Sequence, residues 1–140
     1  MRIIGFAFEK IAAEKEKTKE KNIKINSNID IKSITQDKIE NLNEEVIKIE
    51  FEFKIDYQPN LAKIAFLGYL LITTDKNQAK EILKKWKSKK ISDEIRIPLF
   101  NFILTKCNLK ALQLEEELGL PTHVPMPRVS NQPPSNRTYV

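Results

Sequence analysis

Glycine, histidine and cysteine are scarce in this chain of 140 residues, which contains three glycines, one histidine and one cysteine. A zinc site of the usual type needs about four ligands at fixed spacing, and Cys107 and His123 cannot build its cysteine and histidine forms. The glycines Gly5, Gly68 and Gly119 are too far apart for a phosphate-binding loop. We therefore predict a protein that is not an enzyme and that has no cofactor and no metal.

Long hydrophobic runs are also missing. The longest candidate, residues 64–72, is much shorter than the roughly 20 residues of a membrane-spanning helix, so no membrane span is expected. A single cysteine cannot form an internal disulfide, and the N-terminus lacks the pattern of a signal peptide. These observations predict a cytoplasmic protein.

The size and composition indicate one domain. With 41% hydrophobic residues, the chain can fill a single core. Five of its seven prolines lie in residues 121–140, where little else can be buried. We assign residues 1–128 to the domain and residues 129–140, which are rich in proline and asparagine, to a flexible tail.

Four strands are predicted. Residues 2–11 are apolar and β-branched, residues 23–31 alternate apolar with polar, and the strongest alternation covers residues 47–57. Residues 12–21 lack apolar periodicity and are compatible with a solvated strand extension, a helical turn or a loop, of which an exposed connector is favoured, and residues 35–45 are a polar spacer. The turn at Pro59-Asn60 returns the chain as a fourth strand over residues 61–73.

A hairpin register symmetric about Pro59 pairs large apolar side chains across the third and fourth strands. It places Phe51 opposite Leu67 and Ile49 opposite Tyr69.

Two helices follow. Asp75 is a suitable N-cap, and the next apolar residues recur with helical spacing. Ser92 caps a second helix, which Pro98 is expected to end or kink, so that its longer part begins at Pro98 and stops at Gly119. The predicted fold is α+β, a four-stranded antiparallel sheet with two C-terminal helices packed on one face.

Cysteine, histidine and clustered glutamates can act in catalysis or bind metals, but here each is interpreted as structural or solvated. Cys107 lies on the apolar face of the long helix and is interpreted as a buried, inert thiol. His123 has no carboxylate or cysteine at ligand spacing and is interpreted as structural or exposed. The consecutive carboxylates Glu115, Glu116 and Glu117 point about 100° apart and are interpreted as a solvated helix end.

A lysine-rich helix face carries the net charge of the chain. Residues 75–90 hold seven lysines against Asp75 and Glu81, a local charge of +5 that equals the net charge of the chain. Clustered cations favour phosphate, but arginine is absent here and Trp86 lies on the apolar face. We keep a basic nucleic-acid-binding or scaffold protein, acting through residues 76–90, as the alternative function.

Two segments resemble the bacterial export chaperone family SecB. Residues 45–74, EVIKIEFEFKIDYQPNLAKIAFLGYLLITT, are similar to its third and fourth strands, and residues 97–121, IPLFNFILTKCNLKALQLEEELGLP, to its long helix. The resemblance implies an ATP-independent holdase for unfolded or precursor polypeptides, used in protein export and assembled as a homodimer or homotetramer. Because this chain is basic where the bacterial proteins are acidic, the resemblance does not extend to delivery to the SecA motor.

The resemblance also implies apolar grooves that hold the client. We place the client-binding residues on the first strand and the long helix, where each is equally compatible with a role in the core: Phe6, Phe8, Phe100, Phe102, Leu114 and Leu118. A chaperone dedicated to one partner, such as an antitoxin, is the other possibility within the same family.

Overall fold

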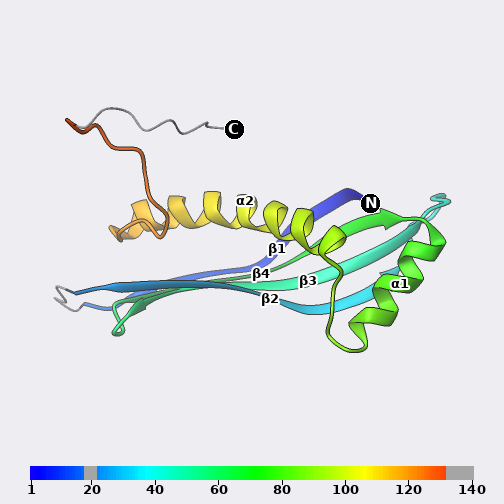
Figure 1. Cartoon of the computed structure of the whole chain (residues 1–140). Coiled ribbons are helices and arrows are strands. Elements are labelled where there is room, and N and C mark those ends of the chain that lie inside the picture. Colours follow the sequence, from blue (N-terminus) through cyan, green and yellow to red (C-terminus); the bar gives the residue numbers. More distant parts are fainter. Residues whose placement is uncertain (18–21, 132–140) are drawn as a thin grey trace.

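A computed structural model describes residues 1–17 and 22–131, and the end of the predicted tail, residues 132–140, lies outside them. Figure 1 shows a four-stranded antiparallel sheet with the long helix over one face. The sheet order is β1-β4-β3-β2, which confirms the predicted α+β class. The elements are β1 (Arg2–Lys15), β2 (Lys24–Asp37), β3 (Glu45–Gln58), β4 (Ala62–Thr74), α1 (Lys76–Trp86) and α2 (Asp93–Leu118).

The strands extend into segments that the sequence predicts as connectors. β1 continues to Lys15 because Ala12 and Ala13 pair with Ala65 and Ile64 of β4. β2 continues to Asp37 by the same kind of pairing with β3. Backbone hydrogen bonds to a long neighbouring strand hold these residues, although they show no apolar alternation. The rest of the first predicted connector includes residues 18–21, which lie outside the described residues.

The predicted hairpin register is wrong by one residue. Phe51 pairs with Gly68 and Ile49 with Leu70, because Pro59 and Asn60 both lie between the paired residues and the centre falls between them. A shift of one residue moves side chains to the other face of a sheet. Leu67 is therefore on the face away from α2.

The close approach of strands at Gly68 predicts a cost for any side chain there. A Cβ atom on Gly68 would lie 2.6 Å from the Ala7 carbonyl oxygen and 2.7 Å from Phe51 Cζ. We expect Gly68→Ala to lower the free energy of unfolding by about 1–3 kcal/mol, measured by urea denaturation. Gly5→Ala is the control, since its Cβ would meet only the Leu71 side chain at 3.3 Å. Equal effects of the two substitutions would contradict this explanation.

Helix α2 is continuous through Pro98, contrary to the predicted break. Pro98 is the sixth residue of the helix, so its ring removes only the N–H bond to the Glu94 carbonyl. Ser92 is the N-cap, although its side chain makes no capping hydrogen bond. The predicted C-terminal stop is confirmed, because Gly119 takes the left-handed conformation with φ 63°.

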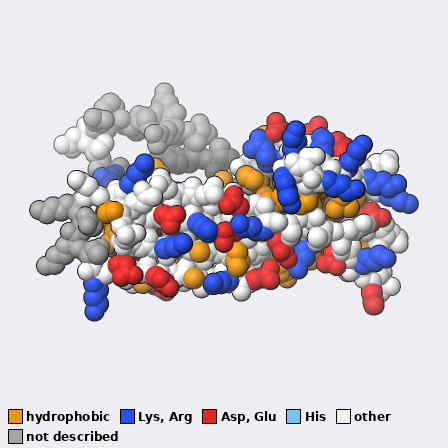
Figure 2. All heavy atoms as spheres, turned by 90° about the horizontal axis from the view of Figure 1, so that it is seen from below, with side chains coloured by type: hydrophobic (Ala, Val, Ile, Leu, Met, Phe, Trp, Pro, Cys, Tyr) orange, Lys and Arg blue, Asp and Glu red, His pale blue; other side chains and the backbone are white. Residues whose placement is uncertain are grey.

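The core lies between α2 and the sheet. One row of α2, with a spacing of four residues, is buried against the sheet: Ile95, Leu99, Ile103, Cys107, Ala111 and Glu115. Helix α1, capped by Asp75 Oδ1 accepting from the Gln78 N–H at 2.7 Å, lies against β2 and β3. The opposite face of the sheet carries acidic, basic and apolar side chains intermixed (Figure 2).

Candidate functional site

The side of α2 that faces β1 carries partly buried aromatic residues. The Phe6 ring contacts Phe8, Phe51 and Phe102 at centroid distances of 5.1, 5.7 and 5.7 Å. Phe8 continues this cluster to Phe66 at 5.2 Å. The outer edge of β1 has no strand partner among the described residues.

Leucines extend this apolar surface toward the end of α2. Leu114 and Leu118 follow Phe102 at multiples of four residues, and Lys15 Nζ donates to the Leu118 carbonyl at 2.8 Å, so the row borders β1. Ile11 of β1 is 45% exposed beside this row. We call the set Phe6, Phe8, Ile11, Phe102, Leu114 and Leu118 the β1-side surface.

Phe100 lies on the other side of the helix. Residues two apart on a helix point about 200° apart, so Phe100 faces away from Phe102 and toward β2. Leu104 follows on the same row, and Ile25, Ile29 and Ile31 of β2 face the same layer, all partly buried. We call these five residues the β2-side surface. The structure therefore brings five of the six predicted client-binding residues to the β1 side of α2 and separates Phe100 from them.

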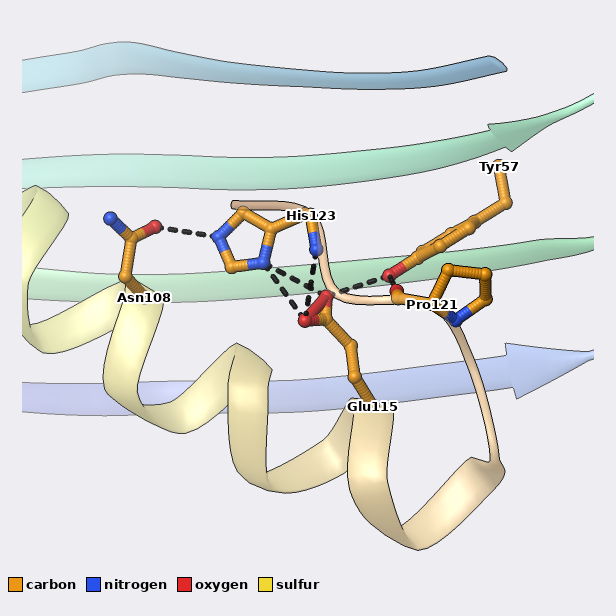
Figure 3. Close-up of polar contacts among 5 residues, drawn as sticks. All are labelled: Tyr57, Asn108, Glu115, Pro121 and His123. Atoms are coloured by element: carbon orange, nitrogen blue, oxygen red, sulfur yellow. Dashed lines mark hydrogen bonds and ion pairs between the residues drawn. The ribbon is translucent and has the colours of Figure 1, made fainter. Parts of the chain in front are cut away.

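A buried polar cluster lies near the C-terminal end of α2, on the side of the helix that faces β2 (Figure 3). The Glu115 side chain is fully buried, and Tyr57 Oη lies 2.6 Å from its Oε2. The ring Nδ1 of His123 lies 2.9 Å from both carboxylate oxygens, and the His123 backbone N–H donates to Oε1 at 3.2 Å. The prediction of a solvated helix end is therefore wrong for Glu115, whereas Glu116 and Glu117 are exposed.

Both ring nitrogens of His123 have hydrogen-bond partners. Its Nε2 lies 2.7 Å from Asn108 Oδ1, so both ring nitrogens face oxygen atoms. A doubly protonated ring donates to both oxygens, and a neutral ring satisfies both only if the Asn108 amide turns its NH₂ group toward Nε2. The geometry thus fixes His123 by hydrogen bonds to Glu115 and Asn108. The sequence interpretation of His123 as structural agrees with this position.

The buried position of Tyr57 predicts that the free energy of unfolding decreases at alkaline pH. Burial raises the pKa of Tyr57 above its usual value, and the hydrogen bond and charge of Glu115 raise this pKa further. The unfolded chain loses this proton near pH 10 while the folded chain keeps it, so stability falls as the pH rises above about 10. We expect this decline to be weaker in Tyr57→Phe, measured by urea denaturation between pH 9 and 11. Equal declines in the two proteins would contradict the shift.

Cys107 is a buried thiol, and the described carboxylates do not gather into a metal-ligand cluster. Burial raises the pKa of the Cys107 thiol to about 12, which keeps it protonated and unreactive. Within residues 1–17 and 22–131, no three histidine, cysteine, aspartate or glutamate side chains converge on a possible ion. The same residues include no helix long and apolar enough to cross a membrane.

The predicted lysine face is exposed on α1 and the segment after it. Lysine side chains gather at this end of the molecule (Figure 2). Lys85 Nζ lies 3.3 Å from Glu81, and Lys89 Nζ lies over the Trp86 ring at 4.5 Å. Trp86 is half-buried, so this face has one aromatic ring, which Lys89 already covers.

Comparison with solved structures identifies the fold. No family model matches the chain, and no curated protein matches its sequence. A solved structure of a SecB-like chaperone from Mycobacterium tuberculosis, in complex with a ChAD peptide from the HigA1 antitoxin, is similar with a TM-score of 0.50. The match covers 94% of this chain and 91% of that chain, at 12% sequence identity. The fold is therefore SecB-like, as the resemblance of residues 45–74 and 97–121 predicts.

Proposed function

We propose that the protein is an ATP-independent holdase that binds unfolded polypeptides on the two sides of α2. The observation that carries this proposal is the set of partly exposed apolar side chains along both sides of the helix, from Phe6 on β1 to Ile31 on β2. Burial of apolar area contributes about 25 cal/mol per Å² whatever the client sequence, so such surfaces suit clients of many sequences. A homodimer or homotetramer is part of the proposal.

The free edge of β1 supports binding of extended chains. An unpaired edge presents backbone N–H and C=O groups to a further strand, and the adjacent β1-side surface would receive its apolar side chains. The similar Mycobacterium chaperone is in complex with an antitoxin peptide, which is consistent with polypeptide clients. Clients in export and a single dedicated partner are both compatible with these surfaces.

Suppression of aggregation tests the proposal. A client enzyme unfolded in urea is diluted into buffer with increasing amounts of the protein, without ATP, and light scattering is recorded. We expect suppression at a stoichiometric ratio of oligomer to client, with the oligomer measured separately by static light scattering. Unchanged client aggregation at a several-fold excess of the protein would refute the holdase.

The exposed lysines of α1 are the observation that favours the alternative, a nucleic-acid-binding or scaffold protein. Binding through phosphate weakens steeply as salt rises, whereas apolar client binding does not. Titration of a labelled RNA at about 50 and 200 mM salt therefore separates the two functions. Salt-sensitive RNA binding together with failure to suppress aggregation would favour the alternative.

A further inference from the structure

Residues 120–124, which we call the strap, follow the end of α2 and lie beside it with a bend at His123 and Val124, and they join no strand of the sheet (Figure 3). Pro121, Pro125 and Pro127 lack the backbone N–H that a strand donates to its neighbour, which disfavours a fifth strand along this path. The strap is therefore held by side chains and a few single hydrogen bonds.

Three contacts hold the strap: the side chains of Leu120 and His123, three residues apart, and the Pro121 carbonyl, which accepts from Tyr57 Oη at 2.7 Å. Leu120 is 7% exposed and belongs to the core, and the backbone N–H and the ring of His123 both contact Glu115. The His123 ring also lies edge-on to Phe53 of β3 at 6.2 Å. Beyond the strap, Met126 is 51% exposed and Val129 is fully exposed. The side-chain attachment is thus a unit of one aliphatic residue followed by one basic residue.

Glu115 is the buried residue that depends on the strap for hydrogen-bond donors. It occupies the buried row of α2 that is otherwise apolar, and Tyr57 is its other partner in the cluster. A carboxylate left on this surface without the strap would lose the ring and backbone donors of His123, which is unfavourable in an apolar environment. Any replacement for the strap must therefore bring one backbone N–H and one side-chain donor to Glu115.

We infer that the strap occupies, within its own chain, a seat for a non-helical polypeptide segment on the β2 side of α2. The competing occupant is a client segment with an aliphatic residue followed three positions later by histidine, lysine or arginine. Its aliphatic side chain replaces Leu120, and its basic residue donates to Glu115 in place of His123. This inference rests on the proposed holdase function and specifies which client segments it recognises.

The attached strap competes strongly because it is tethered. A segment joined to its site by a short linker has an effective concentration in the millimolar range, so an external peptide must overcome this advantage. Loosening the strap is therefore expected to increase the affinity for an external peptide, whereas damage to a purely structural element would not.

Three variants of the full chain test the inference. His123→Ala removes the basic anchor, Leu120→Ala removes the aliphatic anchor without changing the polar cluster, and Val129→Ala is the exposed control. Hydrogen exchange over residues 120–124 reports release of the strap. Fluorescence anisotropy measures binding of a labelled peptide with the sequence of residues 119–127, GLPTHVPMP, and of the same peptide with alanine or lysine in place of its histidine.

We expect faster exchange of the strap and about tenfold tighter peptide binding in His123→Ala and Leu120→Ala, with Val129→Ala unchanged. The lysine peptide should bind about as well as the histidine peptide, and the alanine peptide about tenfold more weakly. Faster exchange with no gain in peptide affinity, or unchanged exchange in both anchor variants, would overturn the inference. Aggregation assays on the same proteins separate the two proposals, since peptide binding without suppression of aggregation would reject only the holdase.

Discussion

Replacing Glu115 with alanine is expected to lower the free energy of unfolding by about 3–5 kcal/mol, the largest effect on stability that we predict. The fully buried carboxylate accepts from Tyr57 and from the backbone and ring of His123. Its removal leaves the His123 backbone N–H and ring Nδ1 without this acceptor and opens a cavity in the buried row, whereas Tyr57 Oη keeps the Pro121 carbonyl at 2.7 Å. Urea denaturation, followed by the fluorescence of the single tryptophan Trp86 at fixed chain concentration, measures the change.

Two further variants show whether the loss of stability comes from the buried position of Glu115 or from removal of any glutamate. Glu116→Ala removes the neighbouring exposed carboxylate and should change stability by no more than about 0.5 kcal/mol. Glu115→Gln keeps one acceptor oxygen but replaces the other with an NH₂ group that cannot accept, so its cost should lie between those of the two alanine variants. A Glu115→Ala protein as stable as Glu116→Ala would show that the cluster does not hold the strap.

The sheet and the helices could be predicted because their signals are local. Apolar alternation over residues 47–57 specifies a strand, and the spacing after Asp75 specifies a helix. The hairpin register could not be obtained this way, because it depends on whether one or two residues form the centre of the turn. The continuity of α2 through Pro98 was also not evident, since the loss of one hydrogen bond near a helix start is offset by the packing of the whole buried row.

The polar cluster has no local signal in the sequence. Glu115 on α2 contacts Tyr57 on β3 and His123 beyond the end of the helix. These partners are 58 and 8 residues away in the sequence. Only the four-residue spacing from Ile95 to Ala111 points to it, since the next member of that row is Glu115. The six client-binding residues were predicted from their apolar placement on the first strand and the long helix. Their division between the two sides of α2 could not be predicted, because it depends on the pairing of β1 with β4, which brings Phe6 against Phe102.

Replacing both Phe100 and Phe102 with alanine is expected to raise about tenfold the amount of protein needed to suppress half of client aggregation. The two rings lie on opposite sides of α2, so the double variant removes an aromatic side chain from each apolar surface. A tenfold change corresponds to about 1.4 kcal/mol of client binding, which one partly exposed aromatic ring on each side can supply. The measurement is light scattering during dilution of the unfolded client, at a temperature where circular dichroism shows that the variant is folded.

The single variants distinguish the two surfaces, and Ile39→Ser is the matched control. Ile39 is 40% exposed in the connection between β2 and β3, so its removal deletes a similar aliphatic surface away from α2. Because the strap lies on the β2 side, we expect Phe100→Ala to account for most of the loss and Phe102→Ala for less. An equal loss in Ile39→Ser would mean that clients bind any exposed apolar residue. A larger loss in Phe102→Ala would instead place the clients along the free edge of β1.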